Sequence, residues 1–274
     1  MLMDEACYII IPTSSKYLDI CKNFIAVLSN SWPDCPYKLV LSITGNDERI
    51  EGAECLFNGS NASLVDCIVN ASNRYKSEYY MIFLGDAFMC GQVDTQEVEK
   101  LLTEVKKNKI DFCCLHPEKS RKKENKVGGE MRYIHVRDRY CHCFGYSLCT
   151  KRYIDEIFVD SGISTDLEYE LWYLNKTQNS KEDFYYKHDA ILLKNIFHIR
   201  CGIKKGKWDR IVYRWIDTHY PEIQLAQRPK LSLMSQIIMI LREKFLYLIP
   251  DGIRIGIKKV VTVIMGKKVF DTMN

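Results

Sequence analysis

An aspartate that follows an apolar run is the first residue whose type and position suit chemistry. Asp86 comes directly after Gly85 and the run Tyr79–Leu84. A carboxylate at the edge where a parallel sheet presents its ligands can hold a divalent cation or accept a hydrogen bond from a sugar hydroxyl. A turn aspartate after a glycine explains Asp86 equally well. The spacing leaves both interpretations open.

An acidic segment supplies the second set of candidates. Residues 164–170 read STDLEYE. Thr165 and Glu168 match a helix capping box, and Asp166 suits the first turn of a helix because the helix dipole favours a negative charge there. Glu170 has less of a structural role, so Glu170, or Asp166 beside it, is the candidate general base for an incoming hydroxyl.

A basic turn supplies the third set. Lys204, Lys205 and Lys207 surround Gly206 and precede Trp208. Lysines around a glycine can approach a diphosphate and neutralise the charge of a leaving group without a metal. An exposed hairpin tip explains the same residues equally well.

Several common catalytic motifs are absent from the sequence. It contains no G-x-G-x-x-G after a strand, no G-x-x-x-x-G-K-[ST], no G-x-S-x-G and no H-E-x-x-H. Dehydrogenases of the dinucleotide-binding type and P-loop enzymes are therefore excluded. The clusters 113–116 and 141–143 hold cysteine and histidine but lack C-x-x-C spacing, so buried strand cysteines are the better interpretation than zinc.

The pattern of apolar runs and helix signals predicts the elements that position these residues. We expect strands at Cys7–Ile11, ended by Pro12, and at Tyr37–Ile43, Tyr79–Leu84, Ile110–Leu115, Tyr133–Val136 and Tyr140–Ser147. We expect helices at Tyr17–Leu28, after Asn61 or Ser63, from Asp94 or Thr95 to about Lys107, at Lys151–Phe158 and from Thr165 to Asn175. Alternating strands and helices predict an α/β fold with a mostly parallel sheet and helices on both faces.

The composition is that of a globular protein. Of 274 residues, 47% are apolar and 27% are charged, which excludes an intrinsically disordered chain and a polytopic membrane protein. The twelve cysteines lie in a chain too long for a small disulfide scaffold, and the N-terminus shows no export signal. We therefore expect a cytoplasmic protein with reduced thiols.

The charge is distributed unevenly along the chain. Residues 226–274 carry nine basic and three acidic side chains, a net charge of +6, and the rest of the chain is at −2. Apolar residues recur at helical spacing over 231–249 and 257–265. We therefore expect a main domain at 1–225 and a basic amphipathic helical tail at 226–274. Its expected partner is an anionic membrane surface, with packing on the domain or a homo-oligomer contact as alternatives. No nucleic-acid-binding motif is present.

Five segments, in this order, carry a resemblance to a known family. They are residues 31–41, 79–94, 140–153, 167–170 and 203–208, within a match from Tyr8 to about Trp208. Together they resemble bacterial polysaccharide-biosynthesis glycosyltransferases of the GT-A type, which act in capsule and O-antigen assembly. The resemblance implies a nucleotide-sugar-binding α/β sheet. It also implies an enzyme that moves a sugar from a nucleoside diphosphate onto a lipid-linked glycan, with inversion expected, at the inner face of the plasma membrane.

The resemblance assigns roles to the candidate residues. Thr13, Ser14 and Ser15, with Tyr17, would contact the nucleotide, and Asp86 would orient the donor sugar or a cation. The lysines at 204, 205 and 207 would meet the diphosphate. Glu170 or Asp166 would deprotonate the acceptor hydroxyl.

One position departs from the family pattern. Members usually have two adjacent acids after the third strand, whereas this chain has Gly85 and Asp86. Losing one carboxylate weakens the case for Mg²⁺ or Mn²⁺ at Asp86 and favours metal-independent neutralisation of the diphosphate by the lysines. It also admits an alternative function, a non-catalytic sugar-nucleotide-binding or glycan-binding member of a polysaccharide assembly complex.

Overall fold

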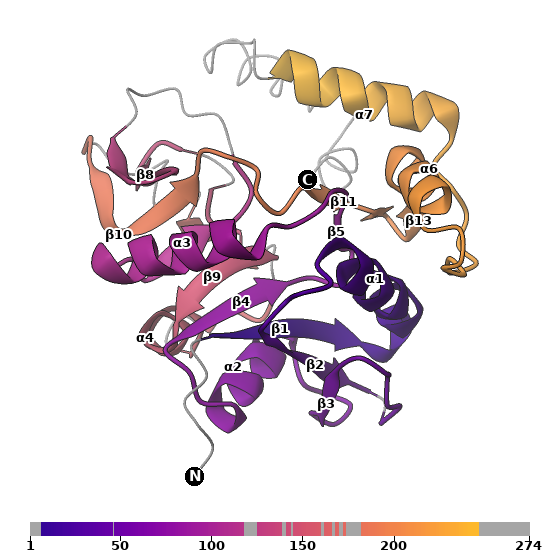
Figure 1. The fold of residues 1–274 in the computed structure, drawn as a ribbon, viewed down its shortest axis with the longest axis horizontal. Coiled ribbons are helices and arrows are strands. Elements are labelled where there is room, and N and C mark those ends of the chain that lie inside the picture. Colours follow the sequence, from indigo (N-terminus) through magenta and orange to yellow (C-terminus); the bar gives the residue numbers. More distant parts are fainter. Residues whose placement is uncertain are drawn as a thin grey trace, which may run out of the picture.

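A nine-stranded sheet forms the centre of the molecule, in the order β3-β2-β1-β4-β9-β6-β10-β8-β7 (Figure 1). The computed structural model describes residues 7–45, 47–117, 125–138, 141–143, 145–159, 162–165, 168–169, 172–173 and 182–246. Strands β9 and β8 run antiparallel to their neighbours, and the other strands of the sheet share one direction. The predicted fold class, an α/β fold with a mostly parallel sheet, is confirmed.

The strands of this sheet are short, and two small sheets accompany them. The large sheet contains β1 (Cys7–Ser14), β2 (Lys38–Thr44), β3 (Glu54–Phe57), β4 (Tyr79–Phe83), β6 (Phe112–Cys114), β7 (Lys126–Gly128), β8 (Met131–His135), β9 (Tyr146–Thr150) and β10 (Tyr185–Leu192). The small sheets pair β5 (Ala87–Met89) with β11 (Ile199–Cys201), and β12 (Ile203–Lys204) with β13 (Lys207–Trp208).

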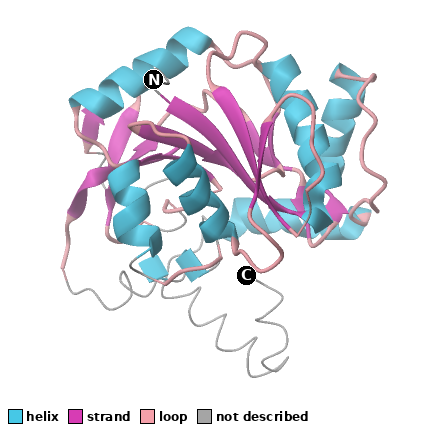
Figure 2. Ribbon diagram, turned by 90° about the horizontal axis from the view of Figure 1, so that it is seen from below, coloured by secondary structure: helices cyan, strands magenta, loops and turns pink. Residues whose placement is uncertain are grey.

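Helices cover both faces of the large sheet (Figure 2). They are η1 (Ser15–Tyr17), α1 (Leu18–Ser31), α2 (Leu64–Arg74), α3 (Thr95–Lys107), α4 (Lys151–Tyr153) with the π-helical turn η2 (Ile154–Val159), α6 (Arg210–His219) and α7 (Leu233–Leu246). Buried residues of α1, α3 and α6 share one hydrophobic core, and those of α2, α4 and η2 share the other. None of the described helices is long and apolar enough to cross a lipid bilayer.

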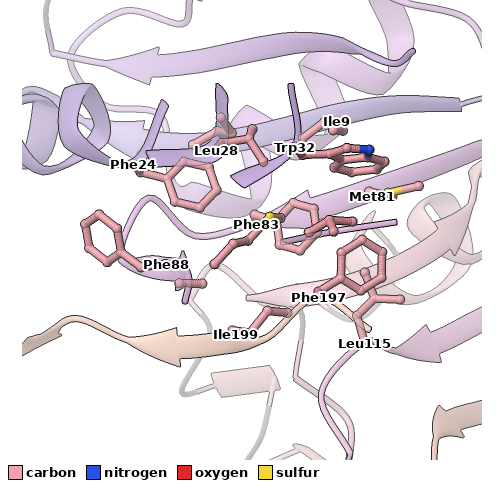
Figure 3. Close-up of a cluster of buried hydrophobic side chains, with 14 of the residues drawn as sticks. Ile9, Phe24, Leu28, Trp32, Met81, Phe83, Phe88, Leu115, Phe197 and Ile199 are labelled. Carbon is pink, nitrogen blue, oxygen red and sulfur yellow. The ribbon is translucent and has the colours of Figure 1, made fainter. Parts of the chain in front are cut away.

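Strand β1 shows how the sheet divides these two cores. Ile9 and Ile11 point into the core with α1, whereas Tyr8 and Ile10 point into the core with α2. Successive side chains of a strand point to opposite faces, so a strand covered on both faces must be apolar throughout. Figure 3 shows the first core, in which Phe24, Trp32, Phe83, Phe88 and Phe197 are among the packed side chains.

Local capping signals set the starts of two helices as predicted. The Ser63 hydroxyl accepts from the Asp66 N–H while the Asp66 carboxylate accepts from the Ser63 N–H, so Ser63, rather than Asn61, caps α2. The Asp94 carboxylate accepts from the Gln96 N–H at the start of α3. Each contact satisfies a backbone donor that the helix cannot pair internally.

Two predicted strand boundaries are wrong. The first strand does not end at Pro12 but continues to Ser14, with Pro12 opposite Ser42 of β2. The pairing of β1 with β4 extends only to Ile10, so the missing N–H of Pro12 falls where the strand is paired on one side. The predicted strand Tyr140–Ser147 is replaced by β9, which starts at Tyr146, and the buried residues 141–143 lie outside any strand.

The remaining predicted helices fall partly outside the described residues. In the stretch predicted as a helix from Thr165 to Asn175, residues 168–169 and 172–173 are helical, and the Glu168 carboxylate accepts from the N–H groups of Ser164 and Thr165 as a capping box requires. Of the predicted tail, α7 is described, and residues 247–274 lie outside the description. The division into 1–225 and 226–274 stays a prediction.

Candidate functional site

The carboxyl ends of β1, β2 and β4 meet at one edge of the large sheet. The three strands are parallel neighbours, and Ser14 at the end of β1 lies opposite Thr44 at the end of β2. Ligands of open α/β sheets bind in the crevice beyond these ends. The segment predicted as a nucleotide-contacting loop is not a loop, because Thr13 and Ser14 end β1 and Ser15 begins η1. These residues and the predicted donor contact Asp86 lie at the same edge.

Helix α1 joins the two parts of this edge through a cysteine. The buried Cys21 thiol donates to Thr13 Oγ1 at 3.0 Å. A Cβ built on Gly85 would sit 2.3 Å from Cys21 Sγ, so glycine is the residue that lets the turn after β4 approach α1 this closely. Burial and, to a smaller extent, the nearby Asp86 carboxylate raise the pKa of the Cys21 thiol to about 12.

Asp86 is held from the other side by a segment far along the chain. The Cys201 thiol donates to Asp86 Oδ2 at 3.5 Å, and the N–H of Gly202 donates to the Asp86 carbonyl at 2.7 Å. The antiparallel pairing of β5 with β11 brings these residues together. Burial raises the pKa of Asp86 above the ordinary value of a carboxyl group, although the Cys201 hydrogen bond opposes this shift. A proton or a hydrogen-bond donor from a ligand would therefore be held well at this carboxylate.

The three candidate lysines lie on a hairpin next to this segment. Strands β12 and β13 pair Lys204 with Lys207, and Lys205 and Gly206 form the turn, both with positive φ. Lys204 is half-buried and its Nζ lies 3.4 Å from Asp209 Oδ2. Lys205 and Lys207 are exposed. The charge of Lys204 also acts on the Cys201 thiol. Because this thiol contacts Asp86, Lys204 is close to the surroundings of Asp86.

Asp209 anchors this hairpin to two helices. Its Oδ1 accepts from the N–H groups of Ile211 and Val212 at the start of α6, and its Oδ2 accepts from Gln236 Nε2 of α7 at 3.0 Å. Although burial alone would raise the pKa of Asp209, the hydrogen bonds from Gln236 and the helix N–H groups, with the charge of Lys204, hold it below its ordinary value. Asp209 is therefore an ionised partner of Lys204.

Tyr17, another predicted nucleotide contact, is the last residue of η1, and an arginine covers its ring. The Arg228 guanidinium lies 4.8 Å from the centre of the Tyr17 ring and forms a two-pronged ion pair with Asp19, both contacts at 2.7 Å. A hollow of about 440 Å³ opens beside this pair, and its lining includes Ser15, Lys16 and Arg228. Asp19 and Glu48 also line the hollow and pair with Arg228 and Lys22. Because its cations outnumber its acids, the hollow suits a phosphate-bearing ligand.

The two candidate bases lie outside this description. Asp166 and Glu170 are both among the residues that the structure does not describe, so their role as general base stays a prediction. Glu168 between them is exposed and caps its own helix. Hydrogen bonds from Ser164 and Thr165 hold the pKa of Glu168 below its ordinary value, which makes it a poor base.

Sequence reasoning missed four residues of this region. Cys21, Cys201, Asp209 and Arg228 contact the predicted residues but were not candidates themselves. Asp209 had a readable signal, since an aspartate before an amphipathic helical stretch is a typical N-cap. The other three are brought in by packing between distant segments, for which the sequence carries no local signal.

The described residues do not supply a ligand set for Mg²⁺ or Mn²⁺. These ions prefer several oxygen ligands, whereas the side-chain partner of Asp86 is a thiol and the close approach of Cys21 excludes an acid at position 85. Within the described part of the chain, no three His, Cys, Asp or Glu side chains gather as a metal site would require. We therefore derive no chemical step through a metal.

Comparisons with known proteins give only low-scoring similarities to solved structures. No protein-family model matches the chain, and no curated protein matches its sequence. Among solved structures, a cytidylyltransferase from Leptospira borgpetersenii is similar with a TM-score of 0.45 and 12% identity, over 87% of this chain and 94% of that one. A protein described as a nucleotide-diphospho-sugar transferase from Desulfovibrio desulfuricans is similar with a TM-score of 0.36 and 12% identity, over 64% of this chain and 78% of that one. At these scores and identities we carry no site residue over from either protein.

Proposed function

We propose that the chain is a glycosyltransferase that uses a nucleoside-diphosphate sugar. The observation that carries the proposal is the Thr13–Cys21–Gly85 contact, which joins the hydroxyl-bearing end of β1 to the half-buried Asp86 at one sheet edge. Such an edge can bind the nucleotide on one strand end and the sugar on the next.

Different residues bind the nucleotide, the sugar and the diphosphate of the donor. Ser15 lines the hollow and offers its hydroxyl to the nucleotide, with Ser14 next to it at the end of β1, whereas Thr13 is buried and supports this end of β1 through its hydrogen bond with Cys21. Asp86 accepts a hydrogen bond from a donor-sugar hydroxyl, and its raised pKa is consistent with a carboxylate short of donors. Lys204, and the exposed Lys205 and Lys207, meet the diphosphate and neutralise its charge as it leaves, without a metal.

The reaction breaks the bond between the anomeric carbon and the diphosphate oxygen and forms a bond from that carbon to an acceptor oxygen. The acceptor proton goes to a base, for which Glu170 or Asp166 is the candidate, and the nucleoside diphosphate leaves with the electron pair of the broken bond. Attack from the side opposite the leaving group inverts the anomeric centre.

The acceptor and the location rest on the sequence resemblance. We propose a lipid-linked oligosaccharide of capsule or O-antigen synthesis as acceptor, and a cytoplasmic protein held at the inner face of the plasma membrane. The basic composition of residues 226–274 supports this location.

A second function is favoured by one observation. The contact between Gly85 and Cys21 leaves no space for a second acid beside Asp86. A member of a polysaccharide assembly complex that binds a sugar nucleotide or a glycan without transferring it would tolerate this loss. Such a protein would bind the nucleotide but release no nucleoside diphosphate.

Two measurements on the full chain test these functions. A thermal-shift panel of UDP, GDP, CMP and dTDP sugars, each with and without Mn²⁺, should give stabilisation by one nucleotide that depends little on Mn²⁺. Release of nucleoside diphosphate with a crude lipid-linked acceptor should then be lost in Asp86→Asn and kept in Asp34→Asn, which changes an exposed aspartate before β2 at the other edge of the sheet. Binding without release supports the second function, and the absence of any nucleotide shift contradicts both.

A further inference from the structure

Helix α7 presents an apolar face to solvent. Leu233, Met234, Ile237, Ile238 and Leu241 are between 46% and 67% exposed, and Ile211 of α6 is 43% exposed. The five α7 residues recur at the spacing of one helical face, whereas Gln236 points inward and is buried. A contiguous set of exposed aliphatic side chains marks an interaction surface. We call these six residues the α6–α7 face.

Cations lie beside this face. A hollow of about 740 Å³ between α6 and α7 is lined by Arg210, Arg214 and Lys230, together with aromatic side chains and one acid, Asp217. Lys230 Nζ lies 3.3 Å from the centre of the Tyr213 ring. The chain continues beyond α7 for residues 247–274, which hold five basic and two acidic side chains.

An apolar helix face beside an excess of cations fits one kind of partner. An interfacial helix buries its apolar side chains at the level of the lipid headgroups while nearby Lys and Arg attract anionic lipids. A second copy of the chain would bring the same cations together and would be repelled by them. We propose that the α6–α7 face docks on an anionic lipid surface.

This docking surface is connected to the candidate donor site. Gln236 of α7 donates to Asp209 Oδ2 and accepts from the Arg210 N–H, and Asp209 pairs with Lys204. The docked helix therefore holds Lys204 in a fixed position relative to the lipid surface. The docking surface specifies how the chain would be held at the proposed membrane location. Docking does not depend on the proposed glycosyl transfer, whereas its use, to meet a lipid-linked acceptor in the plane of the membrane, rests on it.

The test is flotation of the full chain with vesicles of phosphatidylcholine alone or with added phosphatidylglycerol. We expect flotation only with the anionic vesicles, and less of it in high salt. Ile237→Glu with Ile238→Glu should abolish flotation, and Lys230→Gln should weaken binding about fivefold, the effect of about 1 kcal/mol for one cation near the surface. Val159→Glu, which changes an exposed aliphatic residue on η2, should float as the unchanged protein does.

Other outcomes overturn the proposal. If the double Ile237/Ile238 variant floats normally, or if flotation is equal on neutral vesicles, the α6–α7 face is not an anionic-lipid surface. If a chain cut after Leu246 no longer floats while the double variant does, the binding belongs to residues 247–274 instead. If the double variant changes the mass of the protein in solution by light scattering, the face is a contact between two copies. Nucleotide thermal shifts of the same variants separate these results from a failure of the proposed function.

Discussion

Gly85 and Cys21 pack so closely that a Cβ on residue 85 would lie 2.3 Å from the Cys21 sulfur. This contact joins α1 to the turn after β4 and thereby sets the distance between the end of β1 and Asp86. It also leaves little room for a side chain at position 85 while Cys21 keeps its present position. The side chain that is missing at position 85 is replaced in space by a thiol from α1.

This contact predicts a size-dependent loss of stability. Gly85→Ala should lower the free energy of unfolding by about 1–3 kcal/mol, because the added methyl group overpacks a buried site. Cys21→Ala alone should cost less, and combining it with Gly85→Ala should restore part of the loss, because the clashing sulfur is gone. Urea unfolding of the two single variants and the double variant measures this coupling. Additive losses would contradict the packing described here.

The raised pKa of Asp86 predicts how Asp86→Asn alters stability with pH. A carboxyl group whose pKa is higher in the folded state binds its proton more tightly there, so its ionisation destabilises the fold as pH rises through the unfolded and then the folded pKa. Asp86→Asn should therefore be more stable than the unchanged protein at neutral pH, by about 1.4 kcal/mol for each unit of difference. The gain should vanish in acid below the ordinary carboxyl range. Thermal unfolding at several pH values measures it, and a variant destabilised at neutral pH would refute the assigned cause.

Local signals made much of the fold readable from the sequence. The capping residues Ser63 and Asp94 were identified because a cap involves atoms only two or three residues apart. Strand β9 was misplaced, and its position between β4 and β6 was not predicted, because a strand's neighbours are chosen by packing across the whole sheet.

The candidate site also combines a residue that the sequence predicted with one that it did not. Asp86 was readable as the residue after an apolar strand. Its thiol partner Cys201 is 115 residues away and reaches it through the β5–β11 pairing, for which short runs such as Ala87–Met89 give no periodic signal. The sequence therefore predicted that Asp86 follows a strand at the sheet edge but not what surrounds its carboxylate.

The two roles of Asp209 can be separated by substitution. Asp209→Ala removes the cap of α6 and should lower the free energy of unfolding by about 0.5–2 kcal/mol. Asp209→Asn keeps an oxygen that caps α6 but replaces Oδ2, which faces Lys204 and accepts from Gln236, with an amide nitrogen, so it should cost less stability than Asp209→Ala at neutral pH. The lowered pKa of Asp209 means that its ionic contribution is present above the unfolded pKa and is lost as pH falls through the folded pKa. The difference in unfolding free energy between Asp209→Asn and the unchanged protein should accordingly disappear in acid. A difference that persists there would show that the hydrogen bonds of Asp209 matter rather than its charge.

The contacts of Arg228 predict that its substitution weakens nucleotide binding more than it lowers stability. Arg228 donates to both carboxylate oxygens of Asp19 and to the Lys16 carbonyl, and it covers the ring of Tyr17, so one side chain fixes η1 directly after β1. Arg228→Lys keeps a positive charge but cannot form the planar two-pronged pair. We expect both Arg228→Ala and Arg228→Lys to raise the nucleotide Kd about three- to tenfold, because η1 must then be ordered on binding.

The loss of unfolding free energy in these Arg228 variants should stay below about 1 kcal/mol, since the pair with Asp19 is partly exposed. Lys106→Ala is the matched control, because it breaks an ion pair of the same length, with Glu78, just before β4 at the opposite edge of the sheet. That variant should leave the nucleotide Kd unchanged. Titration calorimetry with the nucleotide found in the thermal-shift panel gives the Kd values. If Arg228→Lys binds the nucleotide as tightly as the unchanged protein, a positive charge at this position is sufficient and the bidentate pair with Asp19 is not required. If Arg228→Ala also binds as tightly, the hollow beside Tyr17 does not bind the nucleotide.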